Sequence, residues 1–205
     1  MKGVSELIAA VLVVLIAIAL VSIAYFWGLP LIQKMQGEAI TERVAGYFDP
    51  SNPNSLQGKI VSVANRGGEE VFKLDVDGLW IISTTDNSIQ FTFSSKATNI
   101  KAVGTWVVIT PGSCETPLQP AYLGSNSFVT CARADLAGDR YNITYKVWFR
   151  DLIDPTDPTQ SRRQRIELQP VGPTASTTKT LRISRASVTT TPQGLTVTRV
   201  NILLG

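Results

Sequence analysis

An uninterrupted apolar run near the N-terminus constrains this chain more than any other feature. From Leu7 to Val21, 15 consecutive residues carry no charge and no helix breaker, and the largely apolar, uncharged stretch continues to Ile32. As an α-helix rising about 1.5 Å per residue, Leu7–Ile32 would be about 39 Å long. This is enough to cross a hydrocarbon core of about 30 Å. The run therefore predicts a membrane-spanning helix.

A cleaved secretory signal is the main alternative for such a segment. Its apolar region is usually about 7 to 15 residues long and ends at a small-residue cleavage site. In this chain the apolar run passes directly into more predicted helix. We therefore expect the apolar segment to remain in the mature protein.

Pro30 is expected to divide the helix into two halves. A proline inside a helix lacks a backbone donor and clashes with the carbonyl four residues earlier, here that of Phe26. Gly28 favours a kink or local melting between them. Beyond Pro30 the pattern becomes amphipathic, and the second half is expected to pack one stripe against a folded domain. The apolar positions recur mostly at three- and four-residue steps: Ile32, Met35, Ala39, Ile40, Val44 and Tyr47.

The residues before the apolar run distinguish it from a generic membrane anchor. Lys2 and Gly3 precede the predicted helix, and Glu6 lies in its predicted first turn. A carboxylate there complements the positive end of the helix macrodipole. One interpretation of Glu6 is therefore a charge that stabilises the start of the helix, and the other is a role in assembly.

The order Lys2-Gly3, then Val4-Ser5-Glu6, then an apolar helix of this length resembles the class III signal of type IV pilins. The chain is most similar to archaeal adhesion pilins. The resemblance implies cleavage by a prepilin peptidase between Gly3 and Val4, with residues 1–3 as the signal remnant. Glu6 would then be the third mature residue, whereas the bacterial pilin pattern places its glutamate at the fifth.

The resemblance also implies a function. The chain would be the subunit of an extracellular filament with a role in surface adhesion, held together by bundled N-terminal helices. Its partners would be identical subunits, the membrane before assembly, the prepilin peptidase and the pilus assembly machinery. The alternatives are an archaellum subunit, which serves motility, and a monomeric membrane-anchored binding module. The residues expected to carry assembly are Glu6, Leu7, Val11, Val14, Ile18 and Pro30.

A change of pattern after the turn-rich segment 49–55 predicts a second structural region. Short alternating or β-branched runs follow, separated by Gly, Pro, Asn and Asp. Such runs predict an antiparallel β-sandwich of the Ig-like kind, or a barrel, and no second long helix. The expected fold class is α+β, with a long helix over 4–48 and a β-sandwich over 49–205. The predicted strands are Lys59–Ala64, Val71–Val76, Leu79–Ser83, Ile89–Phe93, Trp106–Thr110, Ser127–Ala132, Tyr141–Arg150, Arg163–Leu168, Lys179–Ile183 and Leu195–Leu203.

The run Tyr141–Arg150 alternates most clearly and is predicted to be a central strand. Its predicted buried face consists of Tyr141, Ile143, Tyr145, Val147 and Phe149. Asn142 falls on the opposite, polar face and begins the tripeptide Asn-Ile-Thr, which matches the N-glycosylation pattern. We interpret Asn142 as a candidate glycosylation site.

Cys114 and Cys131 are the two cysteines of the chain. Two are too few for a cysteine-based zinc site, and their spacing is not that of a CxxC redox motif. In an exported chain a disulfide between them is the expected state. Two separate buried thiols are the alternative.

The composition argues against most catalytic and nucleic-acid functions. Histidine is absent, which removes the commonest general base and the commonest metal ligand. The net charge of +3 is small and forms no basic stripe, so no nucleic-acid partner is expected. We also find no phosphate-binding glycine loop and no nucleophile beside a base. The expectation is a protein that is not an enzyme and has no catalytic, cofactor-binding or metal-binding residues.

Two acidic clusters leave a calcium site as an alternative. Asp75 and Asp77 lie in an Asp-Val-Asp-Gly sequence, but no bidentate glutamate follows at the distance a calcium loop requires. Asp151, Asp154 and Asp157 recur every third residue, and two of them precede prolines. Turns between strands account for both clusters more simply.

Overall fold

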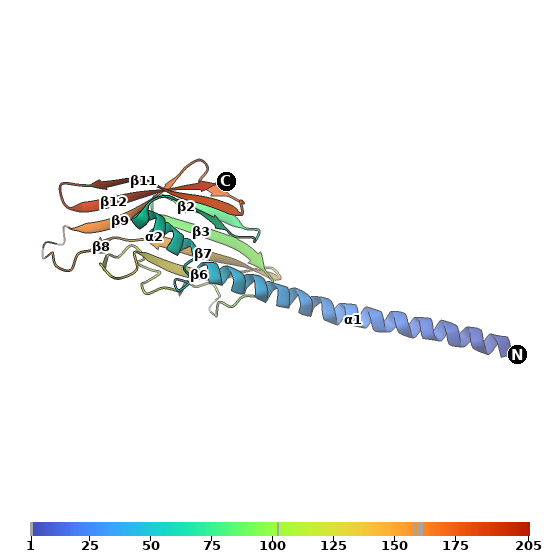
Figure 1. The fold of residues 1–205 in the computed structure, drawn as a ribbon. Coiled ribbons are helices and arrows are strands. Elements are labelled where there is room, and N and C mark those ends of the chain that lie inside the picture. The colour runs from blue at the N-terminus through green and yellow to red at the C-terminus, as the bar shows by residue number, and fades with distance from the viewer. Residues whose placement is uncertain (1, 102, 158, 160–161) are drawn as a thin grey trace.

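The computed structural model describes residues 2–101, 103–157, 159 and 162–205, with side chains from Ile8 onward. Figure 1 shows a long helix that projects from one end of a β-rich domain, with the N-terminus at its free end. This arrangement confirms the predicted α+β class.

The projecting helix, α1, spans Lys2–Tyr47 and contains Pro30. It is helical throughout Phe26–Pro30, and Figure 1 shows no sharp bend there, so the predicted break of the helix is absent. A proline removes one backbone donor, and the turns on both sides of Pro30 keep their own hydrogen bonds. Because α1 already begins at Lys2, Glu6 lies beyond the first turn rather than within it.

The domain end of α1 packs one face against the β-domain. The buried positions are Gly37, Thr41 and Val44, followed by Phe48 just beyond the helix. These residues are three or four apart, as one helix face requires. Five further residues of this part of the helix are half-buried: Gln33, Ile40, Ala45, Gly46 and Tyr47.

Part of the predicted amphipathic stripe is wrong. Ile32, Met35 and Ala39 are exposed. Ile32 and Met35 precede the first buried residue, Gly37, and Ala39 lies off the helix face formed by Gly37, Thr41 and Val44. The docked face also contains Gly37 and Thr41, a glycine and a hydroxyl residue, which a hydrophobicity pattern does not select.

A second helix, α2, spans Leu56–Arg66, where a strand over Lys59–Ala64 was predicted. The hydroxyl of Ser55 accepts a hydrogen bond from the N–H of Gly58 at 3.2 Å and caps the helix. The buried residues Leu56, Ile60, Val63 and Ala64 follow helical spacing and pack on the domain. The strand prediction was wrong because Ile60, Val61 and Val63 are β-branched and favour a strand locally, whereas the three- and four-residue spacing of the buried residues is that of a helix.

The β-domain consists of two six-stranded sheets. The first has the order β1-β11-β12-β9-β8-β5, and the second β10-β2-β3-β7-β6-β4. Most pairs are antiparallel, but β9 with β12 and β5 with β8 are parallel. The strands are β1 Glu69–Lys73, β2 Leu79–Ser83, β3 Ser88–Ser95, β4 Val107–Val108, β5 Ala121–Tyr122, β6 Phe128–Ala137, β7 Arg140–Phe149, β8 Leu152–Ile153, β9 Arg163–Pro170, β10 Ala175–Ser176, β11 Thr180–Thr190 and β12 Leu195–Leu204.

The core includes residues of both sheets, of α2 and of the end of α1. The predicted position of the Tyr141–Arg150 strand is confirmed, since β7 lies between β3 and β6. Four of its five predicted inward residues are buried, and the fifth, Tyr141, is half-buried. The helix α2 packs on the first sheet and α1 contacts β3 of the second.

Candidate assembly helix and its attachment to the domain

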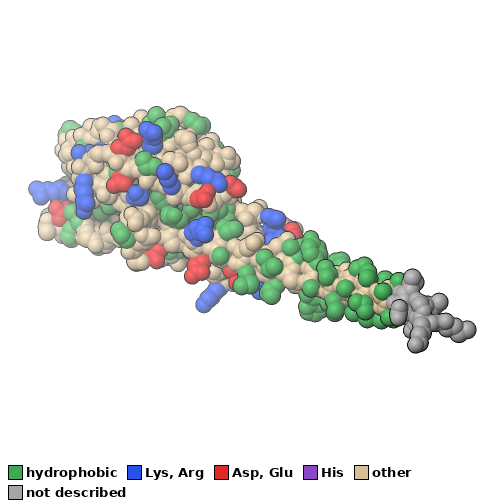
Figure 2. Space-filling view, turned by 45° about the vertical axis from the view of Figure 1, so that its right-hand side comes forward, with side chains coloured by type: hydrophobic (Ala, Val, Ile, Leu, Met, Phe, Trp, Pro, Cys, Tyr) green, Lys and Arg blue, Asp and Glu red, His purple; other side chains and the backbone are tan. Residues whose placement is uncertain are grey.

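The apolar half of α1 makes no contact that buries it. Every described residue from Ile8 to Trp27 is exposed, and Trp27 is 83% exposed. Figure 2 shows this part of the helix covered by hydrophobic side chains, with charged groups only near the domain. Among the described residues, α1 is the one helix long and apolar enough to cross a membrane.

Three of the predicted assembly residues lie on one face of this free helix. Val11, Val14 and Ile18 are all more than half exposed and are spaced three and four residues apart. Pro30 is exposed farther along. The remaining predicted positions, Gly3, Val4, Glu6 and Leu7, lie within the backbone of α1, but their side chains are outside the described residues.

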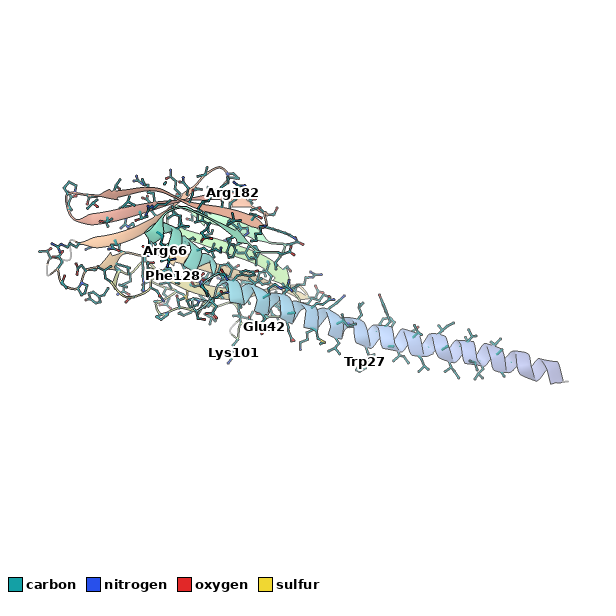
Figure 3. The ribbon with its side chains drawn as sticks, in the orientation of Figure 1. Trp27, Glu42, Arg66, Lys101, Phe128 and Arg182 are labelled. Atoms are coloured by element: carbon teal, nitrogen blue, oxygen red, sulfur yellow. A yellow bond between two sulfur atoms is a disulfide. The ribbon has the colours of Figure 1, made fainter. Side chains whose placement is uncertain are left out.

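Three consecutive aromatic residues lie late in the apolar stretch, and no boundary role was predicted for them from the sequence. Tyr25, Phe26 and Trp27 are each more than 60% exposed, and Figure 3 shows Trp27 standing away from the helix. Tyr and Trp are enriched where a membrane meets water. The aromatic residues lie about 20 residues, or about 30 Å, from Ile8, so they fit the far boundary of a hydrocarbon core.

A close polar contact attaches α1 to the C-terminal end of β3 in the second sheet. The Thr41 hydroxyl lies 3.1 Å from the carbonyl oxygen of Ala97, and the Ser95 hydroxyl donates to the carbonyl of Gly37 at 3.2 Å. A Cβ atom at Gly37 would lie 2.9 Å from the Ser95 Oγ and 3.0 Å from the Ala97 backbone nitrogen. Gly37 therefore permits the approach of the helix to this strand.

Two amides fix the C-terminal end of α1. The Nδ2 of Asn52 donates to the carbonyl of Gly46 at 2.8 Å, and the Nε2 of Gln57 donates to that of Phe48 at 2.8 Å. The last carbonyls of a helix lack partners within the helix. These bonds fix the chain where it leaves α1 and enters α2.

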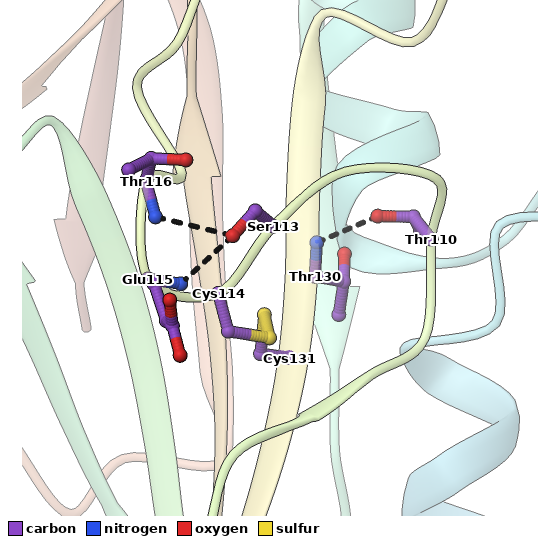
Figure 4. The surroundings of a disulfide bond; sticks show 7 residues. All are labelled: Thr110, Ser113, Cys114, Glu115, Thr116, Thr130 and Cys131. Carbon is purple, nitrogen blue, oxygen red and sulfur yellow. Dashed lines mark hydrogen bonds between the residues drawn. A yellow bond between two sulfur atoms is a disulfide. The ribbon is translucent and has the colours of Figure 1, made fainter.

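The disulfide between Cys114 and Cys131 is formed, with the two Cα atoms 6.1 Å apart. It joins the loop before β5 to β6, and it lies beside Trp106 and Trp148 in a small cluster of its own. Figure 4 shows a further bond close by, in which the Thr130 N–H donates to the Thr110 hydroxyl at 2.8 Å. The loop is thus held to β6 by a covalent and a polar contact.

The candidate glycosylation site Asn142 is exposed on β7. Its neighbours across the sheet are Ser94 of β3 and Asp135 of β6. The side chain therefore lies on the outer face of the second sheet, as the alternation of Tyr141–Arg150 predicted.

The acidic clusters contact cations and hydroxyl groups of the chain itself. Asp75 and Asp77 both lie 3.1 Å from the Nζ of Lys179, and Asp151 accepts two hydrogen bonds from Arg165. Asp154 accepts hydrogen bonds from Thr156 within a turn. In the described part of the chain, no three His, Cys, Asp or Glu residues are grouped so that they could hold a metal ion.

Comparisons with protein-family models, with curated proteins and with solved structures give no match for this chain.

Proposed function

We propose that this chain is the structural subunit of an extracellular filament of the type IV pilus kind, in which copies of α1 form the core and the β-domains face outward. A long apolar N-terminal helix ahead of a β-domain fits the layout of a pilin. The sequence Lys2 to Glu6 supports the narrower assignment to archaeal adhesion pilins.

The observation that carries the proposal is an apolar surface of α1 that is longer than the hydrocarbon core of a bilayer is thick. A hydrocarbon core of about 30 Å accommodates about 20 residues of helix, which Ile8–Trp27 already supplies. Beyond Trp27, the side chains of Leu31 and Met35 are still 60% and 61% exposed. A monomer anchored by Ile8–Trp27 leaves these side chains in water, whereas a bundle of identical helices covers them.

The energetics of a helix bundle fit this surface. Moving α1 from lipid to equally apolar neighbours gains little from the hydrophobic effect, so close packing must hold the bundle together. The small residues Ala9, Ala10, Ala17 and Ala19 permit close approach of neighbouring helices. Return of α1 to water would cost about 25 cal/mol for each Å² of apolar surface exposed. We therefore expect a very stable filament.

The precursor would be held in the membrane by Ile8–Trp27, with Tyr25–Trp27 at the interface. A prepilin peptidase would cut between Gly3 and Val4, and the assembly machinery would transfer the subunit to the filament. Mass spectrometry of the assembled subunit tests this step. A mass that lacks residues 1–3 is expected, and the intact mass would contradict the cut.

Electron microscopy of cells that express the full chain tests the function itself. Wild type is expected to form filaments, and Val14→Asp is expected to form none, because a charge at the centre of the bundle has no partner. Val188→Asp is the matched control, since Val188 is also half exposed but lies on β11 of the domain. Filaments of Val14→Asp would refute packing of α1 in the core.

A second variant separates assembly from membrane insertion. Val14→Trp keeps the segment apolar, so the chain still enters the membrane, but the larger side chain prevents close packing of the helices. We expect this variant to be membrane-bound and unassembled. Wild-type protein that stays monomeric in detergent and on cells would instead favour a membrane-anchored binding module, and supercoiled filaments beside motor genes would favour an archaellum.

A further inference from the structure

Two hollows flank α1 where it joins the domain. The first is a groove of about 550 Å³ with an apolar wall that includes Ala45, Ile100 and Ile109, and with Glu42 and Asp49 beside it. The second has a volume of about 530 Å³ and is lined by Arg43, Tyr47, Lys59, Phe72 and Lys73, among others. We call them the acidic flank and the basic flank. Gly46 contributes to both, so the two flanks lie side by side around one helix end.

The charges of the acidic flank are available to a partner. Glu42 and Asp49 are exposed, and neither forms an ion pair within the described residues. Asp49 accepts hydrogen bonds from the backbone and hydroxyl of Ser51, which favour its charged form. Lys101 lines the same groove and lies on the same side of the domain as Glu42 (Figure 3). Two carboxylates and one ammonium group leave this flank net negative.

The basic flank carries the opposite charge. Lys59 is paired with Glu70 at 2.9 Å, so it contributes little. Arg43 and Lys73 are exposed and form no ion pair with any described carboxylate. Val71 lies on the same outer face of β1 as Lys73 and is 40% exposed, which adds an apolar side chain beside Lys73.

The two flanks point in different directions. Glu42 and Arg43 are consecutive residues of α1, so their side chains leave the helix about 100° apart. Because the face of Thr41 and Val44 is buried against the domain, one copy cannot bring its own two flanks together. Complementary patches at different places on one subunit form a heterologous contact, which continues from copy to copy into a ring or an open helix.

We propose that the acidic flank of each subunit binds the basic flank of the next copy of this chain. Arg43 and Lys73 then face Glu42 and Asp49, while Val71 and the methylene stems of Arg43 and Lys73 cover the apolar wall of the groove. The inference rests on the proposed filament function and assigns the lateral contact between subunits. The contact would fix the register of neighbouring domains, which the nearly uniform apolar surface of α1 specifies poorly.

Charge exchange in the full chain tests the contact. Glu42→Arg and Arg43→Glu are each expected to lower the amount of sedimentable filament by about tenfold or more, because like charges then meet at every contact. Both side chains are exposed, so the thermal unfolding midpoint of each variant is expected to stay at the wild-type value. Glu115→Arg is the matched control, since Glu115 is an exposed acidic residue in the loop that holds Cys114.

Variants that restore the charge pairing show whether lost assembly is due to this contact or to the change of charge in general. The double variant Glu42→Arg/Arg43→Glu is expected to assemble alone, and an equal mixture of the two single variants is expected to assemble together. Single variants that assemble as wild type, or a double variant and mixture that both stay unassembled, would overturn the lateral contact while wild-type filaments still support the proposed function. Absence of wild-type filaments would overturn both.

Discussion

The ring of Phe48, just after α1, stacks on the ring of Tyr145 of β7, with the ring centroids 4.8 Å apart and the planes inclined by 15°. Both side chains are fully buried, and Val44 one turn earlier is buried too. The projecting helix therefore ends inside the core of the domain. A load on the helix would be transmitted to the second sheet through this contact.

Replacement of Phe48 tests the coupling of helix and domain. We expect Phe48→Ala to destabilise the domain by about 3–5 kcal/mol, because it removes a large buried ring and leaves a cavity. Urea unfolding of the full chain in detergent, followed by tryptophan fluorescence, measures this loss. Phe26→Ala is the matched control, since Phe26 is 77% exposed on the free helix, and an equal effect of both changes would contradict the coupling.

Two glycines of α1 offer a matched pair for the docking contact. Gly37→Ala is expected to destabilise the domain by about 1–3 kcal/mol, because the added methyl group meets backbone atoms of the segment after β3. Gly46→Ala adds the same methyl group where nothing lies within 4 Å, so helix propensity predicts a gain of up to about 1 kcal/mol. Thermal unfolding of both variants in detergent gives the comparison. Equal effects at the two positions would show that the close approach at Gly37 is not required.

Most of the strands could be predicted from the sequence because each combines β-branched or aromatic residues with turn residues on both sides. The strand β2, for example, has the predicted bounds Leu79–Ser83. The two-residue strands β5, β8 and β10 are too short for any pattern. The helix α2 was missed although Ser55 and the spacing of Leu56, Ile60 and Val63 carried a helix signal.

Part of the candidate site could likewise be predicted from the sequence, and part could not. The exposed apolar half of α1 follows directly from the uninterrupted apolar run in the sequence. The disulfide was predicted from the two cysteines together with the expectation that the chain is exported. The docking of Gly37 and Thr41 could not be predicted, because small and polar residues become buried only through their contacts with Ser95 and Ala97. The two flanks likewise require residues from segments far apart in the chain, such as Glu42 and Ile100.

The ion pair of Asp86 and Lys146 predicts a pH dependence of stability. Partial burial raises the pKa of Asp86, but hydrogen bonds from Lys146, Ser83 and Ser88 outweigh it and lower the pKa to about 2. A carboxyl group whose pKa is lower in the folded state stabilises the fold above its unfolded pKa, near 3.8, and loses this contribution as the pH falls toward 2. Asp86 should therefore contribute to stability at neutral pH and only weakly at pH 2.

The comparison of wild type with Asp86→Asn isolates this contribution. At neutral pH the variant is expected to unfold at a lower urea concentration than wild type, and the difference should shrink as the pH falls from about 4 to about 2. Asp49 and Asp154 also have lowered pKa values, because Ser51 and Thr156 donate hydrogen bonds to them. Wild type and Asp86→Asn both contain these two groups, so their titration does not affect the difference between the two proteins. A difference in urea midpoint that does not change over this pH range would contradict the assignment to Asp86.

Reduction of the Cys114–Cys131 bond is expected to destabilise the domain without changing its fold. The two cysteines are 17 residues apart, and closing a loop of this length stabilises a protein by about 3 kcal/mol in the chain-entropy estimate. For a protein of this size, that loss lowers the Tm by roughly 6–12 °C. Alkylation followed by mass spectrometry should label neither cysteine before reduction and both after it. The Cys114→Ala/Cys131→Ala variant is the control, because its Tm should be low with and without reductant. A wild-type Tm that does not respond to reduction would show that the contact of Thr110 with Thr130 suffices to hold the loop on β6.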